Sequence, residues 1–167
     1  MKKAARRKNM LATGLTVYLR TPIADDCDEF IRLTQASVRL YQNLASAITT
    51  QKQFAEYIKQ CSKSDFEGLL VCRKKDHVIL GSINLSQISR GGFKSAYLGY
   101  QIGAPFAGQG FMTEALRLVL NYAFKHMKLH RLEANIQPGN NPSIALVRRA
   151  GFTKEGYSRK YLKISGQ

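Results

Sequence analysis

The chain has 167 residues, enough for one domain with a hydrophobic core and too few for two domains of ordinary size. Its 44% hydrophobic and 22% charged residues are ordinary for a globular protein and exclude collagen-like, disordered and disulfide-scaffold classes. No uninterrupted apolar run reaches the roughly 18 residues that span a membrane. The 26 basic and 11 acidic residues give a net charge of +15, which attracts nucleic acid, phosphorylated cofactors or acidic membrane surfaces. A protein that is merely basic is the alternative.

The cysteines and histidines give no pattern typical of a metal or redox centre. Cys27, Cys61 and Cys72 are an odd set whose spacing fits no such motif. We expect them to be reduced thiols in a cytoplasmic protein. His126 and His130 have a spacing that zinc ligands use on helices, but the residue after His126 is methionine, not the glutamate of a metalloprotease. We therefore expect no metal site.

The hydrophobic pattern predicts a basic arm followed by one domain of mixed strands and helices. The first ten residues hold several lysines and arginines and no acid, so we expect residues 1–13 to be a flexible basic arm that could contact RNA. Residues 14–167 are expected to form a single domain. Its predicted elements, in chain order, are a strand over 15–19, a helix opened by Asp25 and Asp26, a helix over 51–62, strands over 67–74, 78–86 and 96–102, a helix over 111–126, a strand over 131–136, a helix over 142–149 and a strand over 157–164. This order indicates an α+β domain with helices packed on a central sheet.

A glycine-rich loop stands between the strand at 96–102 and the clearest helix, at 111–126. It holds Gly103, Gly108 and Gly110. Glycines let the backbone approach a phosphate closely, and the free N–H groups of a helix start point at such an anion. The loop lacks the Gly-Lys-Ser/Thr of a Walker A motif and the spacing of a dinucleotide fingerprint. The glycine-rich loop therefore predicts an anion-binding site, and a plain tight turn is the alternative.

Four linked motifs carry a resemblance to a known family. They are Gly-x-Gly-x-Met-x-Glu-Ala at 108–115, His130-Arg131, Asn-x-x-Ser at 140–143 and Gly-Phe-x-x-Glu-Gly at 151–156. Together they resemble the acetyl-coenzyme A-dependent N-acetyltransferases of the GNAT superfamily, and within it the RimJ/RimL-type branch that acetylates ribosomal-protein N-termini. The resemblance covers about residues 14–167. It implies the GNAT fold: a mixed, mostly antiparallel central sheet, split in a V between the strands at 96–102 and 131–136, with helices on both faces.

The resemblance also implies where acetyl-coenzyme A, the co-substrate, would lie. Its pantetheine arm would bond to the backbone of Tyr100 and Ile102 in the split and to Asn140. Ser143 would lie near the thioester sulfur, and Arg149 stands where the family often has a lysine. The pyrophosphate would sit on the N–H groups of the loop residues Ala107, Gly108, Gln109, Gly110 and Phe111.

The implied chemistry is direct attack of a neutral amine on the thioester, which needs a proton acceptor for the amine and a proton donor for the thiolate. Glu133 is the candidate base, because strand alternation could turn it to the cleft; a surface carboxylate is the equal alternative. Glu155 is the second carboxylate candidate, unless it only pairs with an arginine. Many relatives use a tyrosine acid near position 147, where this chain has Val147. The resemblance to the RimL-type branch, which is thought to use a serine as acid, implies Ser143 for that role. A helix N-cap residue with no chemical role is the alternative.

Two features depart from the family pattern. Pro105 stands where the phosphate loop of relatives often begins with glutamine or arginine, and it has no N–H to donate. The loop entrance is therefore expected to differ. The chain stops at Gly166-Gln167, whereas relatives continue with a tryptophan and an Asp-His pair into a last strand. We expect that strand to be missing, which would leave the strand at 157–164 with an unpaired edge.

These observations predict an N-terminal protein acetyltransferase acting on a ribosomal or ribosome-associated protein. The charge of +15 fits both coenzyme A and docking near ribosomal RNA, and it argues against polyamine or aminoglycoside substrates. A small-molecule amine acetyltransferase of the same fold is the alternative, because the local charge of the acceptor cleft is not given by the total. A basic RNA- or ribosome-binding protein that keeps only the scaffold is a further one. We expect a monomer or dimer without membrane contact.

Overall fold

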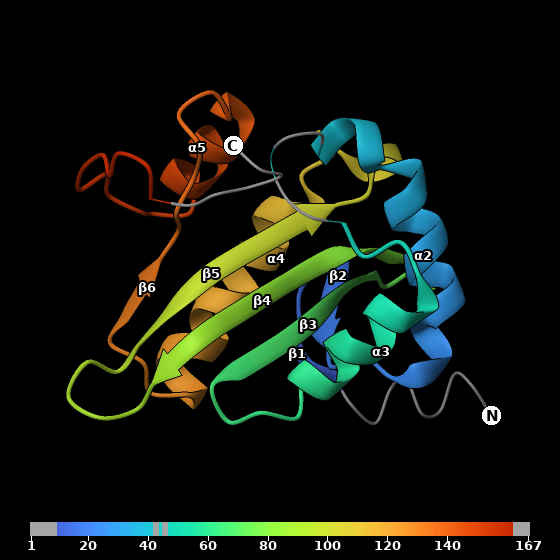
Figure 1. Cartoon of the computed structure of the whole chain (residues 1–167), viewed down its shortest axis with the longest axis horizontal. Helices are drawn as coiled ribbons and strands as arrows, with labels where there is room; N and C mark the ends of the chain where they lie inside the picture. The colour runs from blue at the N-terminus through green and yellow to red at the C-terminus, as the bar shows by residue number, and fades with distance from the viewer. Residues whose placement is uncertain (1–9, 42–43, 45–46, 162–167) are drawn as a thin grey trace.

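The fold is built on one six-stranded sheet, and the computed structural model describes residues 10–41, 44 and 47–161. The strands follow one another across the sheet in chain order (Figure 1). Every neighbouring pair is antiparallel except the last, β5 with β6, which is parallel. The strands are β1 (Met10–Thr13), β2 (Val17–Arg20), β3 (Phe66–Arg73), β4 (Ile79–Ser89), β5 (Ser95–Ile102) and β6 (Arg131–Glu133). The expected α+β class and mixed, mostly antiparallel sheet are confirmed.

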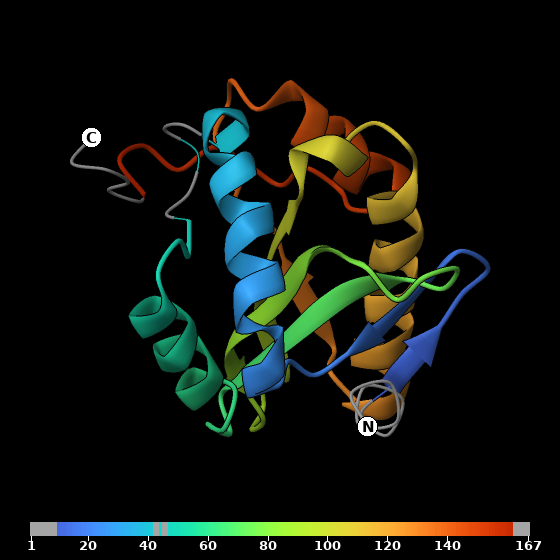
Figure 2. The ribbon, with the colours of Figure 1, turned by 90° about the vertical axis from the view of Figure 1, so that its right-hand side faces the viewer.

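Helices cover both faces of this sheet, as expected. The helices are α2 (Cys27–Ala36), α3 (Gln51–Gln60), α4 (Phe111–Asn121) and α5 (Asn141–Arg149), with short 3-10 turns η1 (Ala24–Asp26), η2 (Val38–Tyr41) and η3 (Ala104–Phe106) and a π-helical segment η4 (Tyr122–His126) that continues α4. Figure 2 shows α2 and α3 on one side of the sheet and α4 on the other. Within the part of the chain described, no helix is long and apolar enough to cross a membrane.

Two hydrophobic cores lie on the two faces, and the central strands supply both. In β3, Leu69 and Val71 pack into the core under α4, whereas Leu70 and Cys72 pack into the core under α2 and α3. All four side chains are fully buried. A strand buried on both faces reads as a continuous apolar run instead of an alternating one. This explains why residues 69–72 carry no polar position.

The V-shaped split is present where β5 and β6 part. The two strands pair only over Ser95–Tyr97 and Arg131–Glu133. β5 continues to Ile102, still paired with β4, while β6 ends at Glu133 (Figure 1). The strand predicted over 131–136 is therefore too long by three residues, because its second half leaves the sheet.

Two other sequence predictions are wrong in part. Met10–Thr13, assigned to the flexible arm, form β1 and pair with β2, because Gly14 closes a hairpin by donating its N–H to the Val17 carbonyl at 2.8 Å. Residues 1–9 of that arm lie outside the described residues. The strand predicted over 157–164 is not formed in its described part, 157–161. Lys160 has a φ of 54°, a left-handed conformation that breaks an extended strand.

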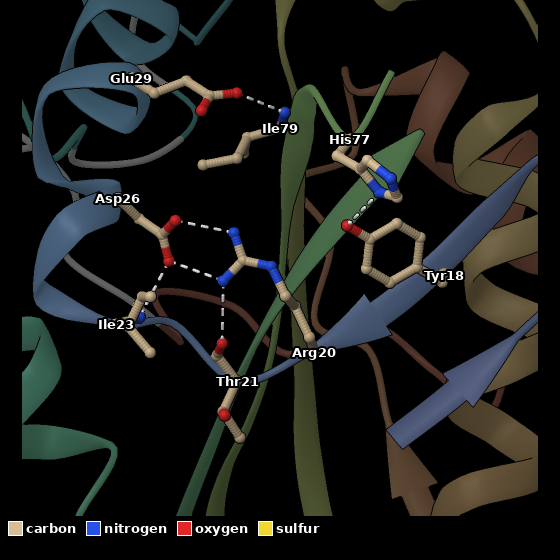
Figure 3. A network of polar contacts seen from close by, with 8 residues as sticks. All are labelled: Tyr18, Arg20, Thr21, Ile23, Asp26, Glu29, His77 and Ile79. Atoms are coloured by element: carbon tan, nitrogen blue, oxygen red, sulfur yellow. Dashed lines mark hydrogen bonds and ion pairs between the residues drawn. The ribbon is translucent and has the colours of Figure 1, made fainter. Parts of the chain in front are cut away.

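A buried ion pair joins β2 to the start of α2 (Figure 3). Arg20 and Asp26 are both 0% exposed, and their side chains meet at Nη1–Oδ2 2.6 Å and Nη2–Oδ1 2.7 Å. Asp26 Oδ2 also accepts the Ile23 N–H at 2.9 Å. Burial lowers the pKa of the Arg20 guanidinium, but the hydrogen bonds to Asp26 outweigh it and hold the pKa above its usual value. The pair therefore ties the end of β2 to the residue directly before α2.

We predict that Asp26→Ala lowers the free energy of unfolding by about 3–5 kcal/mol, because it leaves the buried Arg20 charge without a partner. Asp76→Ala is the matched control: it breaks the exposed Arg73–Asp76 pair, at 2.7 Å, and should cost less than about 1 kcal/mol. Denaturant unfolding at neutral pH measures both. Equal losses for the two variants would contradict the account.

Candidate active site

The free edge of β5 forms one wall of the candidate site. Gly103 donates its N–H to the Leu80 carbonyl of the β4 side at 2.7 Å. Because backbone groups alternate along an antiparallel strand, the N–H and C=O of Tyr100 and Ile102 face the other way, into the split. These are two of the residues predicted to bind pantetheine. Backbone groups without a strand partner need another hydrogen-bonding group.

Tyr41 supplies such a group at Ile102. Its hydroxyl accepts the Ile102 N–H and donates to the Ile102 carbonyl, each at 2.5 Å. Tyr41 ends η2, the turn that follows α2, and burial raises the pKa of its phenol. A side chain from another element therefore binds the edge of β5 in the same way as a neighbouring strand or an extended ligand would.

The glycine loop opens toward free space at the start of α4. Gly108 and Gly110 have φ values of 74° and 84°, which side chains rarely adopt, and a Cβ on either would meet nothing within 4 Å. In the described part of the chain, no side chain forms a capping hydrogen bond at the start of α4. The loop therefore presents backbone N–H groups, with the positive end of the helix dipole behind them, to a space that an anion can enter.

Pro105 occupies a position in this loop where a proline is tolerated. It lies in the first turn of η3, where a missing N–H is tolerated. The neighbouring Ala104 donates its N–H to Ser37 Oγ at 2.9 Å, and Gln109 Nε2 donates to the Pro105 carbonyl at 2.8 Å. The Gln109 side chain thus closes the loop, and its backbone remains available to a ligand.

The start of α5 brings three of the predicted residues together. Asn140 is the N-cap residue, because its Oδ1 accepts the Ser143 N–H at 3.2 Å. The alternative of Ser143 as the cap is therefore wrong. Ser143 Oγ instead lies 2.5 Å from the Tyr100 hydroxyl, which also donates to the Ser143 carbonyl at 3.3 Å. Val147, one turn later, is buried in the core under α4 and offers no polar group.

The two candidate bases share one arginine. Arg131 Nε donates to Glu133 Oε1 at 2.9 Å, and its Nη1 and Nη2 donate to Glu155 at 2.9 and 2.5 Å. The hydrogen bonds from Arg131 hold the pKa of Glu155 below its usual value, which makes Glu155 a poorer proton acceptor. The Glu133 side chain is 36% exposed, against 63% for that of Glu155, and only one of its oxygens accepts from Arg131. Glu133 pairs with Tyr97 in the sheet, at the point where the split begins.

Arg149, the cysteines and His126 lie away from the start of α5 and from the two carboxylates that bind Arg131. Arg149 is exposed in the last turn of α5, at the opposite end from Asn140. The three cysteines are free thiols. His126 stacks on Tyr122, with ring centroids 5.9 Å apart. Among the residues with a described position, no three His, Cys, Asp or Glu side chains gather as a metal site would require.

Sequence reasoning missed the roles of Glu114 and Tyr41. Glu114, inside the motif at 108–115, accepts hydrogen bonds from the Thr16 N–H at 3.0 Å and from the Thr16 hydroxyl. It ties α4 to the turn between β1 and β2, where a Cβ on Gly14 would come within 2.1 Å of the carboxylate. The glutamate in the motif indicates that this position matters, but its partner Thr16 lies 98 residues away in the sequence and is not predicted by any local pattern. Tyr41 gave no signal, because only the fold brings it to Ile102.

Comparisons with known proteins agree with this geometry. The sequence profile of the Acetyltransferase (GNAT) domain matches residues 16–153. A Bacillus subtilis (strain 168) protein named "Probable N-acetyltransferase YjcK" is 33% identical over 161 residues, 92% of this chain and 89% of that protein. The ribosomal protein uS5-alanine N-acetyltransferase of Escherichia coli (strain K12) is 43% identical over 112 residues, 67% of this chain and 56% of that protein. The structure of Mycobacterium smegmatis RimJ in complex with CoA-disulfide has the same fold, with a TM-score of 0.83, 23% identity and coverage of 90% of this chain and 76% of that one.

The Glu114 anchor predicts a pH-dependent contribution to stability. Burial raises the pKa of Glu114, but the hydrogen bonds from Thr16 outweigh it, so the folded-state pKa lies below its usual value. The contribution is then present above the unfolded-state pKa of about 4.3 and is lost as pH falls through the folded-state pKa. We expect Glu114→Gln to cost about 1–2 kcal/mol at pH 7 and progressively less below about pH 4.

Urea unfolding of wild type and Glu114→Gln across pH 3–7 measures this. Glu56→Gln, at an exposed position of α3, is the control and should change little at any pH. A difference between wild type and Glu114→Gln that stays constant with pH would contradict the anchor.

Proposed function

The chain belongs to the GNAT acetyltransferase family, and we propose that it transfers the acetyl group of acetyl-coenzyme A to the N-terminal α-amino group of a protein, with a ribosomal protein as acceptor. One observation carries the proposal: the edge of β5 that has lost its strand partner lies next to a glycine loop that presents N–H groups to open space. An extended, phosphate-bearing ligand matches both parts at once.

Coenzyme binding is assigned to backbone groups more than to side chains. Tyr100 and Ile102 would bind the pantetheine arm through their N–H and C=O groups, and Asn140 would add its side-chain amide. The loop from Ala107 to Phe111 would bind the pyrophosphate. Arg149 would meet a more distant anionic part of the coenzyme. At Ile102 the coenzyme must replace the Tyr41 hydroxyl, which uses the same two backbone groups.

Bound acetyl-coenzyme A supplies an activated acetyl group, and the side chains of this chain handle the protons. Glu133 accepts the proton of the attacking amine, either directly or through water. Its place level with Tyr97, where the split opens, supports this role. Both carboxylates bind Arg131, but Glu155 accepts two hydrogen bonds, which lower its pKa, and Glu133 accepts one. Ser143 donates a proton to the leaving thiolate. Holding amine and thioester side by side contributes several further kcal/mol through proximity.

The acceptor is argued from charge and from relatives. A net charge of +15 repels polyamines and aminoglycosides and favours an acceptor presented near RNA. The E. coli relative at 43% identity acts on a ribosomal protein, as its name states. Three free thiols fit a protein of the reducing cytoplasm, where such acceptors are made.

A substrate panel with a base variant tests this proposal. We expect acetyl transfer from acetyl-coenzyme A to peptides with N-terminal alanine or serine, and little transfer to spermidine or an aminoglycoside. Glu133→Gln should lower kcat by about 100- to 10,000-fold while the coenzyme Kd stays unchanged. Glu56→Gln is the control for a lost surface carboxylate.

Each alternative has its own outcome. Transfer confined to spermidine would reject the protein acceptor and support the small-molecule enzyme. Salt-sensitive RNA binding without any binding of coenzyme A would support a basic RNA- or ribosome-binding protein that keeps only the scaffold. Full activity in Glu133→Gln at all pH values would remove Glu133 from the mechanism.

A further inference from the structure

The contact between Tyr100 and Ser143 joins the two walls of the split. Tyr100 comes from β5 and Ser143 from the first turn of α5, and the two hydroxyl oxygens are 2.5 Å apart. Both residues are half-buried. Ser143 is held from two sides, because Asn140 accepts its backbone N–H while Tyr100 contacts its side chain. A serine hydroxyl on an exposed helix end would rotate freely, and this one is oriented.

The chemistry of the proposed reaction needs more than a serine at this point. A serine hydroxyl is a much weaker acid than a thiol, so donating its proton to a thiolate is uphill unless the serine oxygen is reprotonated at once. A tyrosine phenol, with an ordinary pKa of about 10, is close to a thiol at about 8.5. Val147 is buried and carries no hydroxyl, so it cannot donate a proton here.

We infer that Tyr100 is a positioning residue that acts through Ser143, orienting the Ser143 hydroxyl and replacing its proton when that proton passes to the leaving sulfur. The inference rests on the proposed function. As the amine nitrogen bonds to the acetyl carbon and the carbon–sulfur bond breaks, the Ser143 Oγ proton goes to sulfur and the Tyr100 proton goes to Ser143 Oγ. Solvent then reprotonates the phenolate, and no oxidant or reductant is needed.

The hydrogen-bonding geometry allows both proton positions. In one arrangement Ser143 Oγ–H donates to Tyr100 Oη while Tyr100 donates to the Ser143 carbonyl at 3.3 Å. In the other, Tyr100 donates to Ser143 Oγ, and the serine proton is free to point into the split. Burial raises the pKa of the Tyr100 phenol and the bond to Ser143 lowers it in part. Tyr41 of η2 is a titratable neighbour: burial is the main cause that raises the pKa of its phenol, and Tyr100 raises it further.

A double-mutant cycle tests whether Tyr100 acts through Ser143. We expect Tyr100→Phe to lower kcat about 10- to 100-fold with little change in the KM for acetyl-coenzyme A, and Ser143→Ala to cost at least as much. Tyr100→Phe in the Ser143→Ala background should then cost nothing further. Tyr18→Phe is the control, because it removes another tyrosine hydroxyl bond, from a buried side chain to His77 at 3.1 Å, away from the split. Equal losses from Tyr100→Phe in both backgrounds would overturn the inference.

A second kinetic test uses the acidity of the phenol. Replacing Tyr100 by a fluorinated tyrosine of lower pKa should restore kcat lost in Tyr100→Phe. It should also move the alkaline fall of kcat to lower pH, because the donor must be protonated to work. A purely structural hydroxyl would restore kcat without moving the pH profile, and that result would overturn the relay.

The Tyr100–Ser143 contact is also tested without enzyme turnover, so that the test still applies if the proposed acceptor is wrong. NMR of the labelled tyrosine ring carbon follows Tyr100, in the free protein and with coenzyme A bound. We expect Ser143→Ala to raise the pKa of Tyr100 in both states. A shift that disappears when coenzyme A is bound would show that the contact opens in the complex and would overturn the inference. Absence of acetyl transfer by wild type, with this shift retained, would count against the proposed function alone.

Discussion

The unpaired half of β5 is the constraint on which the candidate site depends. Beyond Tyr97 this strand keeps β4 on one side and, among the described residues, has no strand on the other, because β6 ends at Glu133. A strand in the middle of a sheet rarely tolerates open backbone groups, which must find a hydrogen-bonding partner. At Ile102 that partner is the Tyr41 hydroxyl. The side chain of Tyr100 separately reaches across to Ser143 of α5. The site exists because the sheet is incomplete there.

Contacts far from the split keep this edge and the loop beside it in place. The buried pair of Arg20 and Asp26 sets the start of α2, and η2 after that helix carries Tyr41 to β5. Glu114 fastens the first turn of α4 to the turn between β1 and β2, which holds the glycine loop directly before it. The same anchors that stabilise the fold thus position backbone N–H groups, the kind of group that binds a phosphate without a dedicated basic side chain.

Local patterns predict most elements; the errors come from local backbone geometry and from contacts between residues far apart in the sequence. Neighbouring residues alone predict the helix over 111–126 and the glycine loop before it, and both are present. The sequence predicts a strand over 157–164, but the left-handed backbone at Lys160 is incompatible with an extended strand in the described part, 157–161. Asn140 and Ser143 stood in a recognisable motif, yet which of the two caps α5 depended on their geometry. Tyr41 could not be found, since its contact with Ile102 spans 61 residues of sequence.

Amide hydrogen exchange with coenzyme A tests most directly whether the free edge of β5 is the binding strand. The N–H groups of Tyr100 and Ile102 face the split, and that of Gln101 faces β4 and serves as the internal control. The account predicts that coenzyme A slows exchange at Tyr100 by more than about tenfold, changes exchange at Ile102 less because the coenzyme replaces the Tyr41 hydroxyl there, and leaves Gln101 nearly unchanged. If the Tm rises with coenzyme A but the exchange rates of all three amides stay the same, the ligand binds elsewhere and the account is contradicted.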